Sequence, residues 1–454
     1  MYTMLFIDGV AMPWVKPMTG ESSTANPETI GQVPTKPTLM QATRLWLTIG
    51  LLSFGGPAAQ IALMHRMLVD EKGWLDEETY LNALSFCMLL PGPEAMQLAT
   101  YAGWRLHGLL GGLVAGLLFV LPGALIVLIL AIIYVTFGDV PLVNALFIGI
   151  KAAVLIVVLE ALQRVAKKAL NGLLYWLIAG VAFVGIFFLA LPFPLIVLGA
   201  GLVGYIIASN HTSSARITRS ADHGLVTLIA TVSIWLLLWA LPFVAIYLIN
   251  PDSLLLDIGA FFSRLAVVTF GGAYAVLAYM GQAVVDQFGW LSAGEMMDGL
   301  GLAETTPGPL ILVTEFVGFI AAFREGGMGF GVLGALVALW MTFVPCFLWI
   351  FAGAPHIEWI CSQPRLKSAL TGISAAVVGV ILNLSLWFAL HVIFKSVTLT
   401  EYGWLKVWQP DMLSVDWLVV ALSVVCALAI FVLRWSVLRT LCLASTLGVV
   451  ASFL

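Results

Sequence analysis

The first half of the chain contains Ser53-Phe54-Gly55-Gly56, then Gly73-Trp74-Leu75, then Pro91-Gly92-Pro93. Each motif recurs with a shift of 216 positions, as Thr269-Phe270-Gly271-Gly272, Gly289-Trp290-Leu291 and Pro307-Gly308-Pro309. Further along, the shift grows to 223, because the stretch that starts at Gly149 matches the stretch that starts at Gly372. Three motifs in one register indicate a duplicated unit with a small insertion in the second copy. The copies share mostly glycine and proline, which interrupt helices.

Composition places the chain in a membrane. Apolar residues make up 61% and charged residues 10% of the 454 positions, whereas an ordinary soluble domain carries about 25% charged residues. The apolar runs are about as long as a bilayer is thick. Because backbone groups in hydrocarbon must satisfy one another, such runs predict transmembrane α-helices. We therefore expect an all-α polytopic protein embedded in the lipid bilayer.

The same sequence argues against several other function classes. The 20 lysines and arginines lie singly or in small groups between apolar runs, so they form no basic face for nucleic acid. The five cysteines form no Cys-x-x-Cys pair and the six histidines show no ligand spacing, so we predict no metal site and no cofactor. A phosphate-binding Gly-x-x-x-x-Gly-Lys-[Ser/Thr] loop is missing, which argues against ATP hydrolysis. We predict that the protein is not an enzyme.

Hydropathy predicts about thirteen transmembrane segments. They lie near 45–64, 80–102, 108–136, 140–162, 172–190, 193–208, 224–249, 258–279, 295–322, 327–353, 366–394, 414–433 and 436–453. The first segments of the two copies are seven crossings apart, and this odd number predicts halves in inverted topology. With a cytoplasmic N-terminus, thirteen basic residues fall inside and six outside, as the positive-inside rule expects. Re-entrant hairpins at the Pro-Gly-Pro segments would alter the local assignments, and the sequence leaves that alternative open.

The predicted domains follow from the repeat and from composition. Residues 1–38 are rich in proline and polar residues and are expected to form a disordered cytoplasmic tail. Residues 39–210 form the first repeat, residues 211–256 a linker with a connecting transmembrane helix, and residues 257–454 the second repeat. Duplicated units with interrupted helices are typical of secondary transporters.

The two Pro-Gly-Pro motifs are the strongest candidates for a binding site. Two prolines around a glycine cannot continue a regular helix, so each motif separates two half-helices. Unpaired backbone is tolerated in a membrane only where it faces protein or a wet cavity. The half-helices that begin at Pro93-Glu94 and Pro309 would point free amides and a positive dipole end into such a cavity, which is an anion site in outline. The alternative is a proline kink with glycine-mediated helix packing.

Other residues join this site for reasons of chemistry. Ser53 and Thr269 place a hydroxyl donor beside two glycines that allow close approach to the backbone. Lys151 is an apparently unpaired cation inside an apolar run, and so a candidate anion contact or charge relay. Glu94 would either cap its helix or couple protons. The candidate substrate-binding residues are Ser53, Phe54, Gly55, Gly56, Pro91, Gly92, Pro93, Glu94, Lys151, Thr269, Phe270, Gly271, Gly272, Pro307, Gly308 and Pro309.

These motifs resemble those of the chromate ion transporter family in its long, two-domain bacterial form. The resemblance rests on Phe-Gly-Gly, Gly-Trp-Leu, the run Leu-Pro-Gly-Pro-Glu-Ala-Met-Gln-Leu-Ala at 90–99 and Glu-Thr-Thr-Pro-Gly-Pro-Leu at 304–310, and it covers roughly 40–454. It implies a multi-pass protein of the bacterial inner membrane that exports chromate and confers chromate resistance. It also implies two halves in opposite orientation, with the Phe-Gly-Gly and Pro-Gly-Pro residues as the family's motif positions.

Electrostatics agree with export of a dianion. Moving two negative charges out of a negative interior gains about 4 to 5 kcal/mol per 100 mV, so membrane potential, a proton gradient or both could drive the step. A transporter of sulfate or another oxyanion fits the same motifs. A membrane-embedded hydrolase of phosphorylated lipid would need paired carboxylates such as Glu94 and Glu304, but neither is repeated in the other copy. The sequence does not decide the oligomeric state, and a homodimer remains open.

Overall fold

A computed structural model of the chain describes residues 6–7, 10–11, 37–138, 140–208, 225–270 and 273–453. The chain divides into two units, Met1–Lys36 and Pro37–Leu454. In the first unit, strands β1 (Phe6–Ile7) and β2 (Val10–Ala11) pair antiparallel. The predicted disordered tail otherwise falls outside the described residues and stays a prediction.

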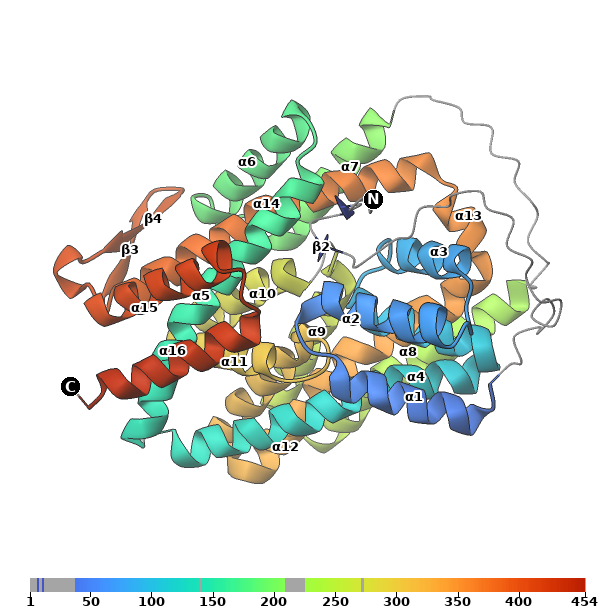
Figure 1. Cartoon of the computed structure of the whole chain (residues 1–454), viewed down its shortest axis with the longest axis horizontal. Helices are drawn as coiled ribbons and strands as arrows, with labels where there is room; N and C mark the ends of the chain where they lie inside the picture. The colour runs from blue at the N-terminus through green and yellow to red at the C-terminus, as the bar shows by residue number, and fades with distance from the viewer. Residues whose placement is uncertain are drawn as a thin grey trace, which may run out of the picture. The chain divides into compact units, whose positions relative to one another are not determined.

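The second unit is built mainly from helices (Figure 1). The elements of the first copy are α1 (Leu39–Leu52), α2 (Gly56–His65), η2 (Arg66–Glu71), α3 (Glu77–Cys87), α4 (Glu94–Phe137), α5 (Pro141–Ala169), α6 (Leu173–Phe187) and α7 (Phe193–Ile207), and α8 (Leu225–Ile249) connects the copies. The elements of the second copy are α9 (Leu254–Val268), α10 (Ala273–Gln282), η3 (Ala283–Gln287), α11 (Ala293–Thr305), η4 (Leu310–Leu312), α12 (Val313–Gly353), η5 (Ala354–His356), α13 (Ile357–Cys361), α14 (Pro364–Ile393), β3 (Val397–Tyr402), β4 (Leu405–Pro410), η6 (Met412–Ser414), α15 (Trp417–Ala427), η7 (Leu428–Val432) and α16 (Val437–Ala451).

Helix length and composition confirm an all-α membrane protein. Within the described ranges, five helical segments are long and apolar enough to cross a bilayer: Glu94–Phe137, Pro141–Ala169, Leu225–Ile249, Leu310–Cys361 and Pro364–Ile393. Four shorter apolar helices accompany them, at Leu173–Phe187, Phe193–Ile207, Trp417–Val432 and Val437–Ala451. The count of about thirteen segments and the inverted orientation stay predictions.

The two longest helices are each bent back on themselves. In α4 the bend lies at His107 and Gly108, where Gly108 has φ of 64°, and in α12 it lies at Gly327, with φ of 72°. After each bend the chain returns along the segment before it, so that Gly103 packs on Gly111 and Gly318 packs on Gly334. Glycine allows this close antiparallel approach of two helices. The bends fall in the gaps that hydropathy predicted, between 102 and 108 and between 322 and 327.

The two copies are intertwined through their last helices. Helix α14 of the second copy packs along α6 and α7 of the first, while α5 of the first copy packs along α15 and α16 of the second. The contacts are matched: Gly149 of α5 lies against Ala444 of α16, and its repeat partner Gly372 of α14 lies against Ala200 of α7. Repeat-related helices of the two copies therefore make reciprocal contacts, as expected for a pair related by a pseudo-two-fold axis.

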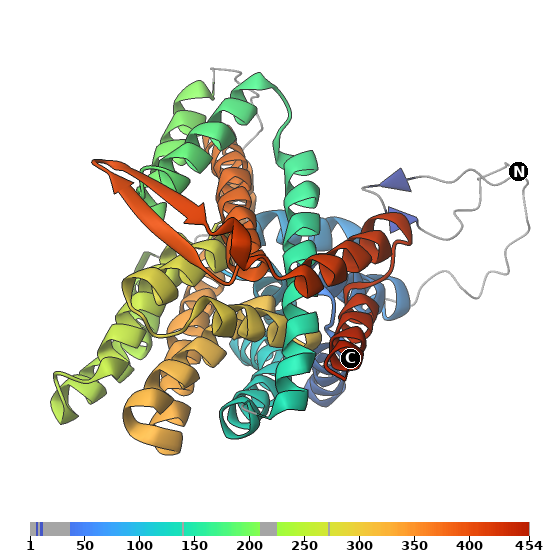
Figure 2. The same ribbon diagram turned by 90° about the vertical axis from the view of Figure 1, so that its left-hand side faces the viewer.

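A β-hairpin between α14 and α15 is a feature that hydropathy did not predict. Strands β3 and β4 pair antiparallel from Val397↔Pro410 to Tyr402↔Leu405, and Gly403 in the turn has φ of 66°. Figure 2 shows the hairpin projecting from the helices. Its strands have six residues each, and such short amphipathic runs are not visible to a search for bilayer-long segments.

Candidate functional site

Both copies interrupt their helices at the two predicted motifs. In the first copy, α1 ends at Leu52 and α2 begins at Gly56, while α3 ends at Cys87 and α4 begins at Glu94. In the second copy the corresponding breaks lie between α9 and α10 and between α11 and η4. The interrupted helices are thus present where the sequence predicted them. Gly271 and Gly272 lie outside the described residues, so their place in the site stays a prediction.

The breaks of the two copies are joined by a reciprocal pair of hydrogen bonds. The amide of Gly92 donates to the carbonyl oxygen of Thr269 at 2.8 Å, and the amide of Gly308 donates to the carbonyl oxygen of Ser53 at 2.8 Å. The glycines have φ of 121° and 98°, a region that other L-residues rarely adopt. The Pro-Gly-Pro of each copy is therefore hydrogen-bonded to the Ser/Thr-Phe-Gly-Gly of the other copy.

This arrangement limits which of the candidate residues can donate a hydrogen bond to an anion. The amides of Gly92 and Gly308 are not free to bind an anion, because a carbonyl of the other copy already accepts from each of them. The hydroxyl groups are also in use: Ser53 Oγ donates to the Ile49 carbonyl and Thr269 Oγ1 to the Leu265 carbonyl, each at 2.6 Å. The last carbonyls of a helix lack amide partners, and a serine or threonine at the helix end satisfies one of them.

Free amides remain at the start of α4. The amides of Ala95 and Met96 have no acceptor among the described residues, and Pro93 supplies no side-chain cap, whereas the Glu94 amide donates to the carboxylate of its own side chain. In the second copy a 3-10 turn, η4, precedes α12 instead of an open α-helical end. Glu94 is half-buried and Leu310 at the matched position is buried, while Gly92 and Gly308 are both buried. The first break therefore differs from the second mainly in keeping free amides at a helix start, where an anion could bind.

The Phe-Gly-Gly of the first copy also remains accessible. Gly55 and Gly56 have φ of 88° and 79°, and a β carbon at Gly56 would meet no atom within 4 Å. Phe54 is 40% exposed. This open space agrees with the expectation that the glycines allow a close approach to the backbone.

Each Pro-Gly-Pro also packs on a proline-bearing helix of the other copy. Gly123, which follows Pro122 in α4, lies against Pro307 and Gly308. At the matched position in α12, Cys346 lies 2.9 Å from where a β carbon on Gly92 would stand. Each break is thus enclosed by the other copy through both a hydrogen bond and close packing.

Two glutamines at the breaks were missed by the sequence reasoning. Gln60 Nε2 donates to the carbonyl oxygen of Gly308 at 2.7 Å and to that of Ser53 at 3.2 Å. Gln97 Nε2 donates to the carbonyl oxygen of Pro91 at 2.7 Å. Both side chains are buried, and the signal that could have found them is a polar amide within an apolar run close to a motif.

Lys151 is not the unpaired cation that the sequence suggested. Its Nζ lies 3.3 Å from Oδ2 of Asp298 in α11, and the hydroxyl of Tyr134 in α4 donates to the same oxygen at 2.9 Å. The partner could not be inferred from helix spacing, since Asp298 belongs to the other copy. Lys151 therefore lies in an ion pair with Asp298. Within the described residues, it makes no hydrogen bond to either break.

Helix α5 carries two further basic residues within electrostatic range of acidic residues at the breaks. Glu94 lies within electrostatic range of Lys168, and Glu304 within range of Arg164. Arg164 also pairs with Glu160 on its own helix, and Tyr274 donates a hydrogen bond of 2.8 Å to Glu304. One basic residue of α5 thus lies near the acidic residue of each break.

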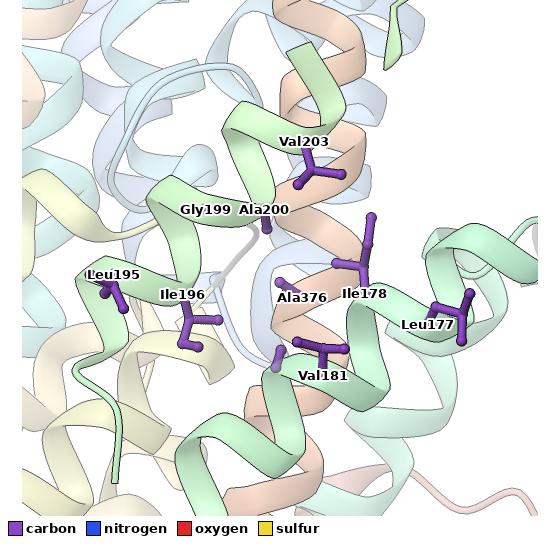
Figure 3. Close-up of a pocket in the computed structure, with 10 residues that line it drawn as sticks. Leu177, Ile178, Val181, Leu195, Ile196, Gly199, Ala200, Val203 and Ala376 are labelled. Atoms are coloured by element: carbon purple, nitrogen blue, oxygen red, sulfur yellow. The ribbon is translucent and has the colours of Figure 1, made fainter. Parts of the chain in front are cut away.

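The cavity shown in Figure 3 is a different kind of site. It has a volume of about 360 Å³ and lies between α6, α7 and α14. Its lining is apolar throughout and includes, for example, Val181, Ile196 and Ala376. None of the predicted site residues lines it. An oxyanion would lose its hydration there without gaining a partner, so the cavity does not suit one.

Comparison with known proteins identifies the family. The chromate transporter family model matches the chain twice, over residues 40–205 and 256–450. The chain is 32% identical to the chromate transport protein of Pseudomonas aeruginosa, over 79% of this chain and 83% of that protein. It is 31% identical to the probable chromate transport protein of Synechococcus elongatus, over 76% and 82% of the two chains. It is 30% identical to the chromate transport protein of Cupriavidus metallidurans, over 77% and 83%.

No solved structure matches the chain. The family model and these relatives confirm the resemblance that the duplicated motifs indicated. The chain belongs to the chromate transporter family.

Proposed function

We propose that this protein exports chromate across the bacterial inner membrane and thereby confers chromate resistance. The observation that supports the proposal is that the interrupted helices of the two copies are hydrogen-bonded to each other through the Gly92 and Gly308 amides. The relatives of this chain are named chromate transport proteins. Interrupted helices that meet across a repeat are the usual binding architecture of secondary transporters.

The proposed binding site is the first break, around the start of α4. The amides of Ala95 and Met96 would donate to the oxygens of the tetrahedral dianion, as helix N-termini do for sulfate and phosphate. Gly55 and Gly56 would allow the anion to approach the backbone. The Pro-Gly-Pro and Phe-Gly-Gly residues of the second copy would form the matching half of the site when the other side opens.

Glu94 and Lys168 would control access to this site. A carboxylate at the first position of α4 repels a dianion bound to the same amides. We therefore propose that Glu94 turns toward Lys168 or takes up a proton when chromate binds. Arg164 would act in the same way on Glu304 in the second break, since those two groups are also within electrostatic range.

Alternating access follows from the pseudo-symmetry. If the halves are inverted, with the N-terminus in the cytoplasm, rocking of one half against the other would exchange the open and closed breaks. The membrane potential favours outward movement of the dianion by about 4 to 5 kcal/mol per 100 mV. Cytoplasmic chromate would thus enter at one break and leave from the other.

The test is chromate accumulation in everted membrane vesicles. We expect accumulation that rises with an imposed interior-positive potential, because the inside of an everted vesicle corresponds to the outside of the cell. Equal accumulation at zero potential and without any ion gradient would contradict the proposal. Excess sulfate serves as the specificity arm: if sulfate abolishes chromate uptake and is itself accumulated, the substrate class is the tetrahedral oxyanion and not chromate in particular.

A Lys168→Met variant tests the site, with Lys367→Met as the matched control on α14. Lys168 lies in the last turn of α5 and Lys367 in the first turn of α14, but only Lys168 is within electrostatic range of Glu94. We expect the Michaelis constant for chromate to rise in the first variant alone. Equal constants in the two variants would remove Lys168 from the site.

A further inference from the structure

One buried ionic cluster lies away from both breaks. It consists of Lys151 on α5, Tyr134 on α4 and Asp298 on α11, and Oδ2 of Asp298 accepts from both of the others. The side chain of Asp298 is 5% exposed and that of Lys151 is 27% exposed. Oδ1 of Asp298 is buried and has no hydrogen-bond partner within the described residues.

Burying such an ionic cluster inside a membrane protein costs folding free energy. Burying an ion pair removes the hydration of both charges, and the cost is recovered only when every polar atom finds a partner. Here one carboxylate oxygen lacks a partner, so the ionised pair is incompletely stabilised. Ionisable residues retained inside transmembrane segments are functional candidates by default, and the breaks already described do not use this cluster.

The charged groups around Asp298 are more exposed than Asp298 itself. Helix α11 packs against α4, α5, α12, α14 and α16. Tyr134 comes from α4 and Lys151 from α5, while Glu295 of α11 itself and Arg324 of α12 form an exposed ion pair at the start of α11. In the described part of α14 and α16, no charged group contacts Asp298. Lys151 lies beside Gly294, next to this pair, and the exposed fraction of the side chains falls from 46% at Arg324 and 27% at Lys151 to 5% at Asp298.

The cluster is connected to the second break by two shared helices. Asp298 lies on α11, which ends at Thr305 directly before the break. Tyr134 lies on α4, whose Gly123 packs against Pro307 in that break. Helix α11 is thus held to α4 at two points, the Tyr134–Asp298 hydrogen bond and the packing of Pro307 on Gly123. If the Tyr134–Asp298 hydrogen bond breaks, α11 loses one of these two contacts with α4, and the Pro-Gly-Pro turn that follows α11 can shift.

The cluster takes residues from both copies, and the repeat-related set of positions lacks its ionisable groups. At the repeat-related positions, Asn82 stands for Asp298, Ser374 for Lys151 and Ile357 for Tyr134. None of these side chains titrates near neutral pH. A proton-dependent change of this kind would therefore act on the second break only.

We propose that the Lys151–Asp298–Tyr134 cluster is a proton-coupling site that links inward proton movement to chromate export. In each cycle the Asp298 carboxylate takes one proton from water on one side and returns it to water on the other, while Lys151 keeps its charge. Protonation weakens the contacts of Asp298 with Lys151 and Tyr134, releases α11 and lets the second break open. This inference rests on the proposed transport of chromate.

The experiment uses purified full-length protein in proteoliposomes, with chromate uptake and the internal pH measured together. One arm imposes a membrane potential without a pH gradient, and the other imposes a pH gradient with the potential clamped at zero. We expect both arms to drive uptake by the wild type, with proton movement that depends on chromate. In Lys151→Met/Asp298→Asn we expect uptake driven by the pH gradient to fall by about tenfold or more, without chromate-dependent proton movement, while potential-driven uptake remains.

The matched control is Lys406→Met/Glu401→Gln, which removes an ion pair of the same kind (2.9 Å) from the β3–β4 hairpin. It should leave both arms unchanged. A cluster variant that keeps the wild-type ratio of protons to chromate would overturn the proposal and leave the cluster a structural ion pair. Wild-type uptake that responds to potential but never to the pH gradient would overturn the coupling alone, whereas no chromate uptake in either arm would overturn the proposed function as well.

Tyr134→Phe gives an independent measurement if the double variant does not insert. It keeps the ring contacts with Phe147 and Phe316 and removes only the hydroxyl that donates to Asp298. Because the ionised carboxylate loses a donor, the pH midpoint of gradient-driven uptake should shift upward. An unchanged midpoint would contradict the assignment.

Discussion

Replacing Gly92 by alanine tests how the two breaks hold each other. The native φ of 121° lies in a region unfavourable for alanine, and the added β carbon would stand 2.8 Å from Gln97 Nε2 and 2.9 Å from Cys346 Sγ. Positive φ costs an L-residue about 1–2 kcal/mol. Overpacking costs about 1–3 kcal/mol more, so the total loss of stability should be about 2–5 kcal/mol.

The assay is thermal unfolding in detergent together with chromate uptake by everted vesicles. We expect Gly92→Ala to lower the unfolding midpoint and to abolish uptake while the protein still inserts. Gly180→Ala is the control, because Gly180 lies in α6 and a β carbon there meets no atom within 4 Å. Adding Cys346→Ala removes one of the two clashes, so the double variant should recover about 1 kcal/mol of stability. The reasoning is refuted if Gly92→Ala unfolds and transports like Gly180→Ala.

Three further predictions concern single side chains. Gln60→Leu should lower stability by about 1–3 kcal/mol, because the buried Gly308 carbonyl loses its 2.7 Å donor; an unfolding midpoint equal to that of the wild type would contradict this. Glu94→Gln should lower the Michaelis constant for chromate by removing a competing negative charge from the start of α4, and a higher constant would count against the proposed site. The Thr79 amide and hydroxyl donate to the Asp76 carboxylate and hold the pKa of this group below its usual range. The stability that Asp76 gives α3 is therefore fully present above the usual pKa and is lost as the pH falls through the lowered pKa. Asp76→Asn should make the unfolding midpoint fall less steeply at acid pH, and an equally steep fall would argue against this role.

Local sequence signals predicted the parts of the fold that local chemistry controls. Glycine and proline act on their own backbone, so the duplicated Pro-Gly-Pro and Phe-Gly-Gly motifs placed the helix interruptions correctly. The apolar runs likewise located the bends at Gly108 and Gly327, because a gap in hydropathy marks the turn between two helices.

The partners of these groups depend on tertiary structure and were not predicted. Gly92 was a candidate substrate-binding residue, but its amide donates to the Thr269 carbonyl in the other copy. Lys151 was expected to be unpaired, but its partner is Asp298, also in the other copy. A single sequence shows which groups need a partner but not which distant residue provides it. The positions of the helix breaks could therefore be predicted, whereas the hydrogen-bond partners at them could not.

The central claim is that interrupted helices of two intertwined copies bind a doubly negative oxyanion. An experimental density map of the protein in lipid with chromate present tests it most directly. The account predicts a tetrahedral ligand at the start of α4, with its oxygens within hydrogen-bond distance of the Ala95 and Met96 amides. A map in which chromate binds elsewhere, or in which both breaks are sealed from solvent in every conformation, would contradict it.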